Sequence, residues 1–149
     1  MKKIKKISAL ETYPVRHPVL REGKSIESCH FDGDNLETTI HFGLYLQDNI
    51  IGVVSVFESK NEIFTNKKQF QIRGMAVLKE QQKKNFGAEL IIATEKHCFE
   101  QKPCLIWFNA RKEAIEFYKK MGYKTNGLSF EIKDIGTHII MSKNCSSSS

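Results

Sequence analysis

Between residues 70 and 121 the sequence changes from a strand pattern to a helical pattern and then repeats that change. Residues 70–78 are rich in β-forming side chains, and residues 86–101 place apolar side chains at helical spacing. The short apolar run 104–110 predicts a buried strand, and residues 114–121 predict a second amphipathic helix. Strands that alternate with helices in this way indicate an α/β sheet.

The segments outside this core pattern add further strands. Residues 3–7 predict a first strand, and residues 123–143 predict two closing strands around a turn. Residues 38–46 and 49–57 are β-rich and are joined by a short turn, which together predict a hairpin.

The segment after the first strand predicts a short or interrupted helix. Ser8 and Glu11 form a capping-box pattern, in which each side chain can bond the main-chain N–H of the other residue. Pro14 and Pro18 must kink this helix or divide it into short pieces. The polar segment 23–37 then predicts a loop.

The expected order of elements is β-α-β-β-β-α-β-α-β-β. This order predicts an α/β fold with a central mixed, mostly antiparallel twisted sheet that is flanked by helices in a single domain. A chain of 149 residues suits one compact domain, which we place over residues 1–144. The serine-rich segment 145–149 predicts a disordered tail.

Composition narrows the class of protein. The chain is 40% hydrophobic and 27% charged, as in ordinary soluble proteins, and no apolar run is long enough to span a membrane. The net charge of +6 favours an anionic partner, but the chain lacks the basic stripe with interleaved aromatic residues that is typical of nucleic-acid binding. The four cysteines include no CxxC pair, which favours reduced thiols in a cytoplasmic protein and disfavours a metal site.

The helix expected from residue 86 begins in a way that suits an anion. Its first main-chain N–H groups lack intrahelical acceptors and lie at the positive end of the helix macrodipole. Lys83 and Lys84 add charge, Gly87 permits close approach, and Asn85 tolerates the left-handed conformation well for a non-glycine residue. The dinucleotide and Walker glycine patterns are absent, so an ordinary surface turn is the alternative interpretation.

Two motifs together resemble the GNAT superfamily of acetyl-CoA-dependent N-acetyltransferases. Residues 73–91, RGMAVLKEQQKKNFGAELI, resemble motif A of the family, with Asn85 where a glycine is usual. Residues 109–123, NARKEAIEFYKKMGY, resemble a later motif in which an asparagine ends a strand and a helix carries A-x-x-F-Y-x-x-x-G-Y. The resemblance covers the chain from about residue 43 onward and implies a GNAT-like fold. Within the family, the sequence resembles a bacterial subgroup of unassigned acceptor.

The resemblance implies acetyl-CoA as cosubstrate and no metal. The main-chain N–H groups of the loop and first helical turn are expected to hold the pyrophosphate, and the edge of the preceding strand is expected to pair with the pantetheine arm. Gly74 is a possible bulge in that strand. The implied cosubstrate-binding residues are Met75, Ala76, Val77, Gln82, Lys83, Lys84, Asn85, Phe86, Gly87, Ala88, Asn109 and Tyr118.

Tyr118 is the residue to which the resemblance assigns catalysis. A neutral amine attacks the thioester carbonyl, a main-chain N–H at residues 75–77 can stabilise the oxyanion, and the Tyr118 hydroxyl can protonate the leaving thiolate. Tyr118 also lies on the apolar face of its helix, which is consistent with a core aromatic residue. The motif around it favours the catalytic interpretation.

The acceptor half of the site has weaker signals. Histidine titrates near neutrality, so His138 is a candidate base, although an ordinary polar residue is the alternative. Other candidates for this base are Glu58, Glu131 and His41. Arg16 and Arg21 can hold an acidic group of the acceptor, because guanidinium suits carboxylate and phosphate, or they can be surface charges.

The sequence therefore predicts an N-acetyltransferase that transfers the acetyl group of acetyl-CoA to a primary amine of a small-molecule acceptor by direct attack in a ternary complex. The alternatives are a protein or peptide N-acetyltransferase and a non-catalytic CoA-binding module on the same fold. We expect a cytoplasmic monomer or homodimer without nucleic-acid or membrane partners.

Overall fold

The structure is a computed structural model that describes residues 1–145. The chain divides into two compact units. The first unit comprises Met1–Glu58 and Ile72–His97, and the second comprises Ser59–Gln71 and the chain from Cys98 onward. Of the expected tail, residue 145 ends the last strand, and residues 146–149 lie outside the described residues.

The first unit contains the N-terminal strands and the two longer helices. Its elements are β1 (Lys2–Ile7), a 3₁₀ turn (Leu10–Thr12), α1 (Tyr13–Leu20), a second 3₁₀ turn (Ile26–Cys29), β2 (Ile40–Leu46), β3 (Asn49–Glu58), the later part of β4 (Gln69–Val77), a third 3₁₀ turn (Lys79–Gln81) and most of α2 (Phe86–Phe99).

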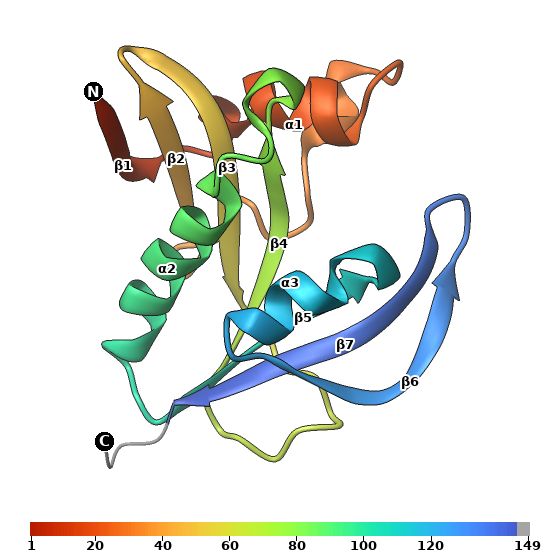
Figure 1. Ribbon diagram of the computed structural model, residues 1–149. Helices are drawn as coiled ribbons and strands as arrows, with labels where there is room; N and C mark the ends of the chain where they lie inside the picture. The colour runs from red at the N-terminus through yellow and green to blue at the C-terminus, as the bar shows by residue number, and fades with distance from the viewer. Residues whose placement is uncertain (146–149) are drawn as a thin grey trace. The chain divides into compact units, whose positions relative to one another are not determined.

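The helices α1 and α2 cover opposite faces of the strands in the first unit. Val53 of β3 packs with Val15 of α1 and with Ala76 of β4. The preceding residue, Gly52, faces α2, since a β-carbon at this position would lie 3.1 Å from Leu90 Cδ1. Because successive strand residues point to opposite faces, the two helices lie on different sides, and Figure 1 shows α2 along β2 and β3.

The start of α1 confirms the capping-box prediction. The Ser8 N–H donates to Glu11 Oε1 at 2.8 Å, and the Glu11 N–H donates to Ser8 Oγ at 3.3 Å. The 3₁₀ turn then leads into α1, which is eight residues long, with Pro14 in its first turn and Pro18 inside it. The short length agrees with the expected effect of the prolines.

Among its described residues, the second unit contains three strands that pair antiparallel and one short helix. Its elements are the first residues of β4, β5 (Cys104–Arg111), a 3₁₀ turn (Lys112–Ala114), α3 (Ile115–Lys120), β6 (Lys124–Ile132) and β7 (Gly136–Cys145). β7 pairs antiparallel with both β5 and β6. Residues 69–71 of β4 pair in parallel with residues 105–107 of β5.

Helix α3 ends at the glycine that the sequence predicts as its cap. Gly122 has φ +97°, the left-handed conformation that glycine adopts readily. Its N–H donates to the Lys119 carbonyl and the Tyr123 N–H donates to the Tyr118 carbonyl, both at 3.0 Å. This is a Schellman motif, and it turns the chain from α3 into β6.

The strand order of the sheet is β1-β2-β3-β4-β5-β7-β6. The prediction of a mixed, mostly antiparallel α/β sheet flanked by helices is confirmed, whereas the domain boundaries 1–144 stay a prediction. The helix expected over residues 86–101 ends at Phe99 and not at Gln101, because the Gln101 N–H bonds the Cys98 carbonyl at 2.9 Å in a closing turn. Among the described helices, none is long and apolar enough to cross a membrane.

Candidate functional site

The loop before α2 has the backbone geometry that the sequence predicts at Asn85. Asn85 has φ +66°, so the left-handed conformation expected there is confirmed. Lys83 also has a positive φ, +65°, which the sequence did not indicate because lysine has no preference for this conformation. Two of the three residues just before the helix therefore have the left-handed backbone conformation.

The first turn of α2 presents main-chain N–H groups that the helix itself does not use. The first bond into the helix runs from the Glu89 N–H to the Asn85 carbonyl at 3.2 Å. The N–H groups of residues 86–88 precede this bond and have no intrahelical acceptor. The Lys2 ammonium lies 2.8 Å from Glu89 Oε2 and 5.7 Å from the centre of the Phe86 ring, so it offsets the negative charge of Glu89 in this first turn.

A side chain ties this loop to the end of β4. Gln82 Nε2 donates to the Val77 carbonyl at 2.9 Å. The Gln82 amide thus braces the loop against the strand that was expected to hold the pantetheine arm. Lys84 donates to Gln81 Oε1 at 3.1 Å, whereas Lys83 is exposed.

The strand β4 carries the second group of expected cosubstrate residues. Its pairing with β5 covers only residues 69–71, before the segment Met75–Val77. Ala76 is buried in the core, and its neighbours Met75 and Val77 are half-buried. Gly74 has φ +67° inside the strand, in agreement with the irregularity expected there, and a β-carbon at this position would lie 2.8 Å from Phe31 Cε2.

The second unit positions Asn109 and Tyr118 around Phe108. Along β5 the buried residues Phe108 and Ala110 alternate with the exposed Asn109. The Tyr118 ring of α3 lies 4.4 Å from the Phe108 ring and 6.2 Å from the Tyr123 ring, centre to centre. Phe108, the chain neighbour of Asn109 in β5, thus packs against Tyr118, which belongs to the same sequence motif as Asn109.

The Tyr118 hydroxyl is available for chemistry. Within residues 1–145 it forms no hydrogen bond with the protein, although the ring is held by aromatic contacts. Burial raises the pKa of Tyr118 to about 12. The hydroxyl therefore stays protonated at neutral pH and can act as a proton donor.

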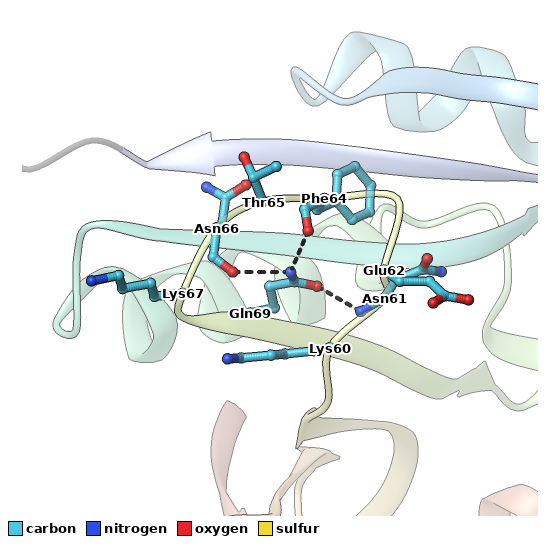
Figure 2. Close-up of a pocket in the computed structure, with 8 residues that line it drawn as sticks. All are labelled: Lys60, Asn61, Glu62, Phe64, Thr65, Asn66, Lys67 and Gln69. Atoms are coloured by element: carbon cyan, nitrogen blue, oxygen red, sulfur yellow. Dashed lines mark hydrogen bonds between the residues drawn. The ribbon is translucent and has the colours of Figure 1, made fainter.

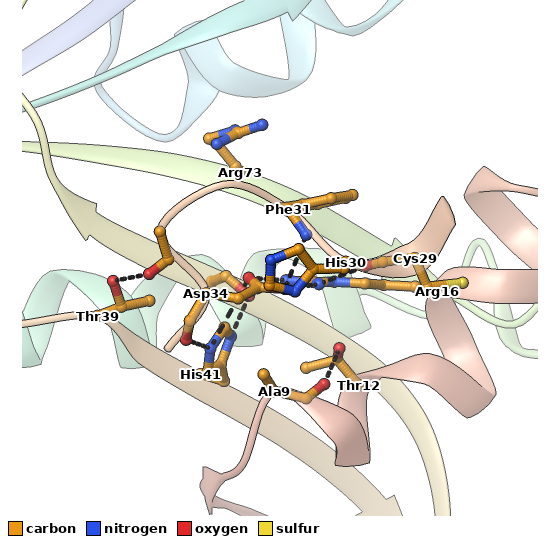
Figure 3. A network of polar contacts seen from close by, with 12 residues as sticks. Ala9, Thr12, Arg16, Cys29, His30, Phe31, Asp34, Thr39, His41 and Arg73 are labelled. Carbon is orange, nitrogen blue, oxygen red and sulfur yellow. Dashed lines mark hydrogen bonds and ion pairs between the residues drawn. The ribbon is translucent and has the colours of Figure 1, made fainter. Parts of the chain in front are cut away.

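Arg16 lies in a buried polar network in the first unit (Figure 3). Its side chain is 0% exposed. Nη1 donates to Asp34 Oδ2 at 2.7 Å and to the Cys29 carbonyl at 2.8 Å, and Nη2 donates to Asp34 Oδ1 at 3.0 Å and to Ser55 Oγ at 2.9 Å. The terminal nitrogens of Arg16 are thus engaged by the protein, so contact of Arg16 with an acceptor stays a prediction that this geometry does not favour.

Arg21 and His138 are placed differently. Arg21 is half-buried, with Nε donating to the Ser28 carbonyl and Nη1 to the Leu20 carbonyl, both at 3.1 Å. His138 is 5% exposed, its Nδ1 lies 2.9 Å from the Gly136 carbonyl, and its ring stacks on Phe130. Whether either residue faces an acceptor stays a prediction.

The other candidate bases have no common location. His41 is buried in the Arg16 network, with Nδ1 2.6 Å from Ser55 Oγ and Nε2 2.9 Å from the Asp34 carbonyl. Burial lowers the pKa of His41, so the neutral form is favoured there. Glu131 accepts a hydrogen bond from the Thr137 hydroxyl on the neighbouring strand, and Glu58 is exposed at the end of β3.

The structure also has an open hollow of about 630 Å³ that contains none of the expected site residues (Figure 2). Its lining comes from the loop between β3 and β4 and from the first residue of β4: Lys60, Asn61, Glu62, Phe64, Thr65, Asn66, Lys67 and Gln69. The Gln69 side chain organises this loop, because Oε1 accepts the Asn61 N–H at 2.7 Å and Nε2 donates to the Asn66 carbonyl at 3.0 Å. The side-chain amide of Gln69 is thus used in hydrogen bonds within the loop. We assign the hollow no part in catalysis.

Comparisons with known proteins identify the family of this chain and agree with its fold. The sequence profile of the acetyltransferase (GNAT) domain matches residues 27–145. The uncharacterized N-acetyltransferase YitI of Bacillus subtilis strain 168 is 34% identical over 143 residues, which are 96% of each chain. The chain belongs to the GNAT acetyltransferase family, and the predicted enzyme class, an N-acetyltransferase, is confirmed.

Solved structures of the same fold bind CoA or a CoA derivative. An aminoglycoside 6′-N-acetyltransferase complexed with coenzyme A superposes with a TM-score of 0.73 at 15% identity, covering 95% of this chain and 96% of that one. Arabidopsis thaliana Naa50, in complex with the bisubstrate analogue CoA-Ac-MVNAL, superposes with a TM-score of 0.73 at 18% identity, covering 97% and 99%. These likenesses show the fold.

The sequence did not single out several residues of the network around Arg16. Phe31 and Asp34, from the loop after α1, meet Arg16 there, and Arg73 of β4 contacts the Phe31 ring. No local pattern marks them, because a loop carboxylate, a loop aromatic residue and a strand arginine each have an ordinary explanation in isolation.

Proposed function

We propose that this chain transfers the acetyl group of acetyl-CoA to a primary amine of a small-molecule acceptor by direct attack in a ternary complex. The observation that carries the proposal is the left-handed backbone at Asn85. It gives the loop into α2 the conformation of a glycine at the position where the motif departs from its usual residue. The main-chain N–H groups that follow have no intrahelical acceptors, so they can donate to an anion.

The first unit supplies the groups for the donor. The N–H groups from Lys83 to Ala88 donate to the pyrophosphate, and the Lys83 and Lys84 side chains contribute charge. The main chain of residues 75–77 pairs with the amide-rich pantetheine arm in the manner of an added strand. An N–H of the same segment stabilises negative charge on the thioester oxygen as the amine attacks.

The second unit supplies a side-chain amide and a proton. Asn109, exposed on β5, hydrogen-bonds the pantetheine arm. Tyr118 donates its hydroxyl proton to the sulfur as the carbon–sulfur bond breaks, and its raised pKa keeps that proton in place until the step occurs. The amine nitrogen loses one proton to a base, for which His138 is the candidate.

A small acceptor is favoured by the segment that follows β1. Its helix α1 and the loop after it are fixed against β3 by the buried bonds of Arg16 to Asp34 and Ser55. A segment held in this way suits a covered pocket better than an open peptide groove. Fold neighbours include an aminoglycoside 6′-N-acetyltransferase and Naa50, so the fold by itself does not choose the acceptor.

A binding experiment tests the donor half. Acetyl-CoA is expected to raise the melting temperature of the wild type. Gly87→Asp should lose most of this increase, because its carboxylate would lie where the pyrophosphate binds. Gly87→Asn has nearly the same size without the charge and is the matched control. If Gly87→Asp binds acetyl-CoA as tightly as Gly87→Asn, the loop is not the pyrophosphate site.

A kinetic experiment tests the proton donor. A screen of amines, polyamines, amino acids, aminosugars and peptides for CoA release identifies an acceptor. With that acceptor, Tyr118→Phe should lower turnover by about 100-fold or more and leave acetyl-CoA affinity nearly unchanged. Tyr123→Phe, in the same aromatic cluster, is the control. Equal turnover in Tyr118→Phe and the wild type would remove Tyr118 as the acid, and turnover on peptides alone would exclude the small acceptor.

A further inference from the structure

The Phe31 ring is surrounded by three arginines in the first unit. The guanidinium carbons of Arg16, Arg21 and Arg73 lie 3.9, 5.1 and 5.1 Å from the ring centre. Phe31 itself is buried, with 7% exposure. Three cations around one aromatic ring repel one another, so a nearby negative charge is needed to offset their charge.

Only Arg16 has a carboxylate partner in this cluster. Asp34 bonds both terminal nitrogens of Arg16 and also accepts the Phe31 N–H at 2.9 Å. Asp34 is therefore fully used by its partners. Within residues 1–145, neither Arg21 nor Arg73 forms an ion pair with a carboxylate.

Arg73 keeps most of its hydrogen-bonding capacity. Its one hydrogen bond within the described residues is a long one, from Nη1 to the Asp32 carbonyl at 3.4 Å, out of five N–H donors on a guanidinium. The side chain is half-buried and also lies over the Phe57 ring at 5.1 Å. Burial lowers the pKa of Arg73, because desolvation disfavours the charged form. Figure 3 shows the Arg73 side chain extending away from the Arg16–Asp34 pair.

Arg21 has the same combination of fixed position and free donors. Two carbonyls hold its Nε and Nη1, and its second terminal nitrogen has no protein acceptor among the described residues. An arginine that is stacked on an aromatic ring loses little conformational freedom when it binds a carboxylate or phosphate. Arg21 and Arg73 thus form a positively charged pair that contacts the Phe31 ring and has unused donors.

We propose that Arg21 and Arg73 form an oxyanion-binding site and that the acceptor of this enzyme is an amine that also carries a carboxylate or phosphate group. The inference rests on the proposed function for the amine, and on the arginine pair for the anionic group. Arg73 lies two residues before Met75, on the strand proposed to hold the acetyl donor. An anion bound at Arg73 would therefore direct the acceptor toward that strand.

The test compares amines that differ only in the anionic group. The two matched pairs are lysine with cadaverine, which lacks the carboxylate, and O-phosphoethanolamine with ethanolamine, which lacks the phosphate. Each amine is titrated by calorimetry into the protein alone and into the protein saturated with CoA, so that no acetyl transfer occurs. The variants are Arg73→Gln, Arg73→Lys and Arg21→Gln, with the exposed Lys6→Gln as a control of equal charge change.

We expect the anionic member of at least one pair to bind about 10-fold or more tightly than its neutral partner. Arg73→Gln and Arg21→Gln should abolish this preference, Arg73→Lys should retain part of it, and Lys6→Gln should not change it. A preference confined to one pair identifies carboxylate or phosphate as the group that is bound. Melting curves confirm that each variant is folded.

The inference is overturned if both members of both pairs bind equally, including no binding of either, or if the preference survives in both glutamine variants. Failure of the proposed function has a different signature. In that case CoA does not bind or Gly87→Asp has no effect, while the titrations into the protein alone still report on Arg21 and Arg73.

Discussion

Arg16 and Arg73 share the Phe31 ring but have opposite surroundings. Arg16 is fully buried, and its terminal nitrogens bond Asp34, Cys29 and Ser55. Arg73 is half-buried and has one long bond to a carbonyl. The two arginines therefore differ in role: Arg16, which is paired with a carboxylate, fixes the segment after β1, whereas Arg73, which has no carboxylate partner among the described residues, retains donors for a ligand.

The difference follows from where the carboxylate lies. The Asp34 side chain is 0% exposed and aligns both oxygens with Arg16, which gives a bidentate pair with good geometry. A buried pair of this kind contributes little net stability relative to apolar residues, but removal of one partner is costly. Substitutions of the Arg16 partners, of the backbone beside Phe31 and of Arg73 itself should therefore differ in their cost to stability.

Asp34→Ala should produce the largest effect. Arg16 would remain buried without its carboxylate, and we expect the free energy of unfolding to fall by about 3–5 kcal/mol. Chemical denaturation measures the change. Asp32→Ala, which removes an exposed carboxylate two residues away, is the control and should change stability by about 0.5 kcal/mol or less. Equal losses in the two variants would show that the network does not fix this segment.

Gly74→Ala should have the next largest effect. The new β-carbon would lie 2.8 Å from Phe31 Cε2, and φ at this position is +67°. Both the contact and the backbone conformation are unfavourable, so we expect a loss of about 1–3 kcal/mol. Gly23→Ala has φ +79° with open space around the β-carbon, so it isolates the backbone contribution. A loss in Gly74→Ala no greater than in Gly23→Ala would mean that Phe31 moves freely.

Acidification should weaken the Arg16 network in two stages. Burial lowers the pKa of His41, so below about pH 6.5 the unfolded chain takes up this proton before the folded chain does. Burial raises the pKa of Asp34, but the hydrogen bonds from Arg16 and from the Phe31 N–H outweigh this effect, so the pKa of Asp34 is lowered overall. The contribution of Asp34 to the free energy of unfolding is therefore present above about pH 4 and is lost as the pH falls further.

Stability should therefore fall with decreasing pH, with a slope of up to about 1.4 kcal/mol per pH unit for each proton. Urea unfolding between pH 7 and pH 3 measures the slope. His41→Gln should remove the stage that begins near pH 6.5. His30→Gln alters an exposed histidine close to Asp34 and should keep this stage. An unchanged upper stage in His41→Gln would exclude His41 as its source.

Arg73→Gln should have the smallest effect on stability. Its side chain contributes cation–π contacts with Phe31 and Phe57 but no ion pair, so we expect a change of about 1 kcal/mol or less in the free energy of unfolding. Denaturation of Arg73→Gln beside Arg16→Gln makes the comparison direct. Similar large losses in both would show that Arg73 is a structural residue and not a binding one.

Local sequence signals predicted much of the fold and the donor side of the site. The Ser8–Glu11 capping box, the cap at Gly122 and the left-handed Asn85 are all present as expected. Each depends on residues that are close in the chain, where side-chain chemistry and allowed backbone angles decide the conformation. The order of strands and helices follows from the same local periodicity.

The sequence alone thus determined the element order, the family motifs and the loop that precedes α2. Only the tertiary structure decided which arginine is free. Arg16 and Asp34 are 18 residues apart, and Arg73 meets the Asp32 carbonyl across 41 residues. Such pairings are set by how the strands and the loop after α1 pack, because charge and hydrogen bonding act across space and leave no periodic trace in the chain.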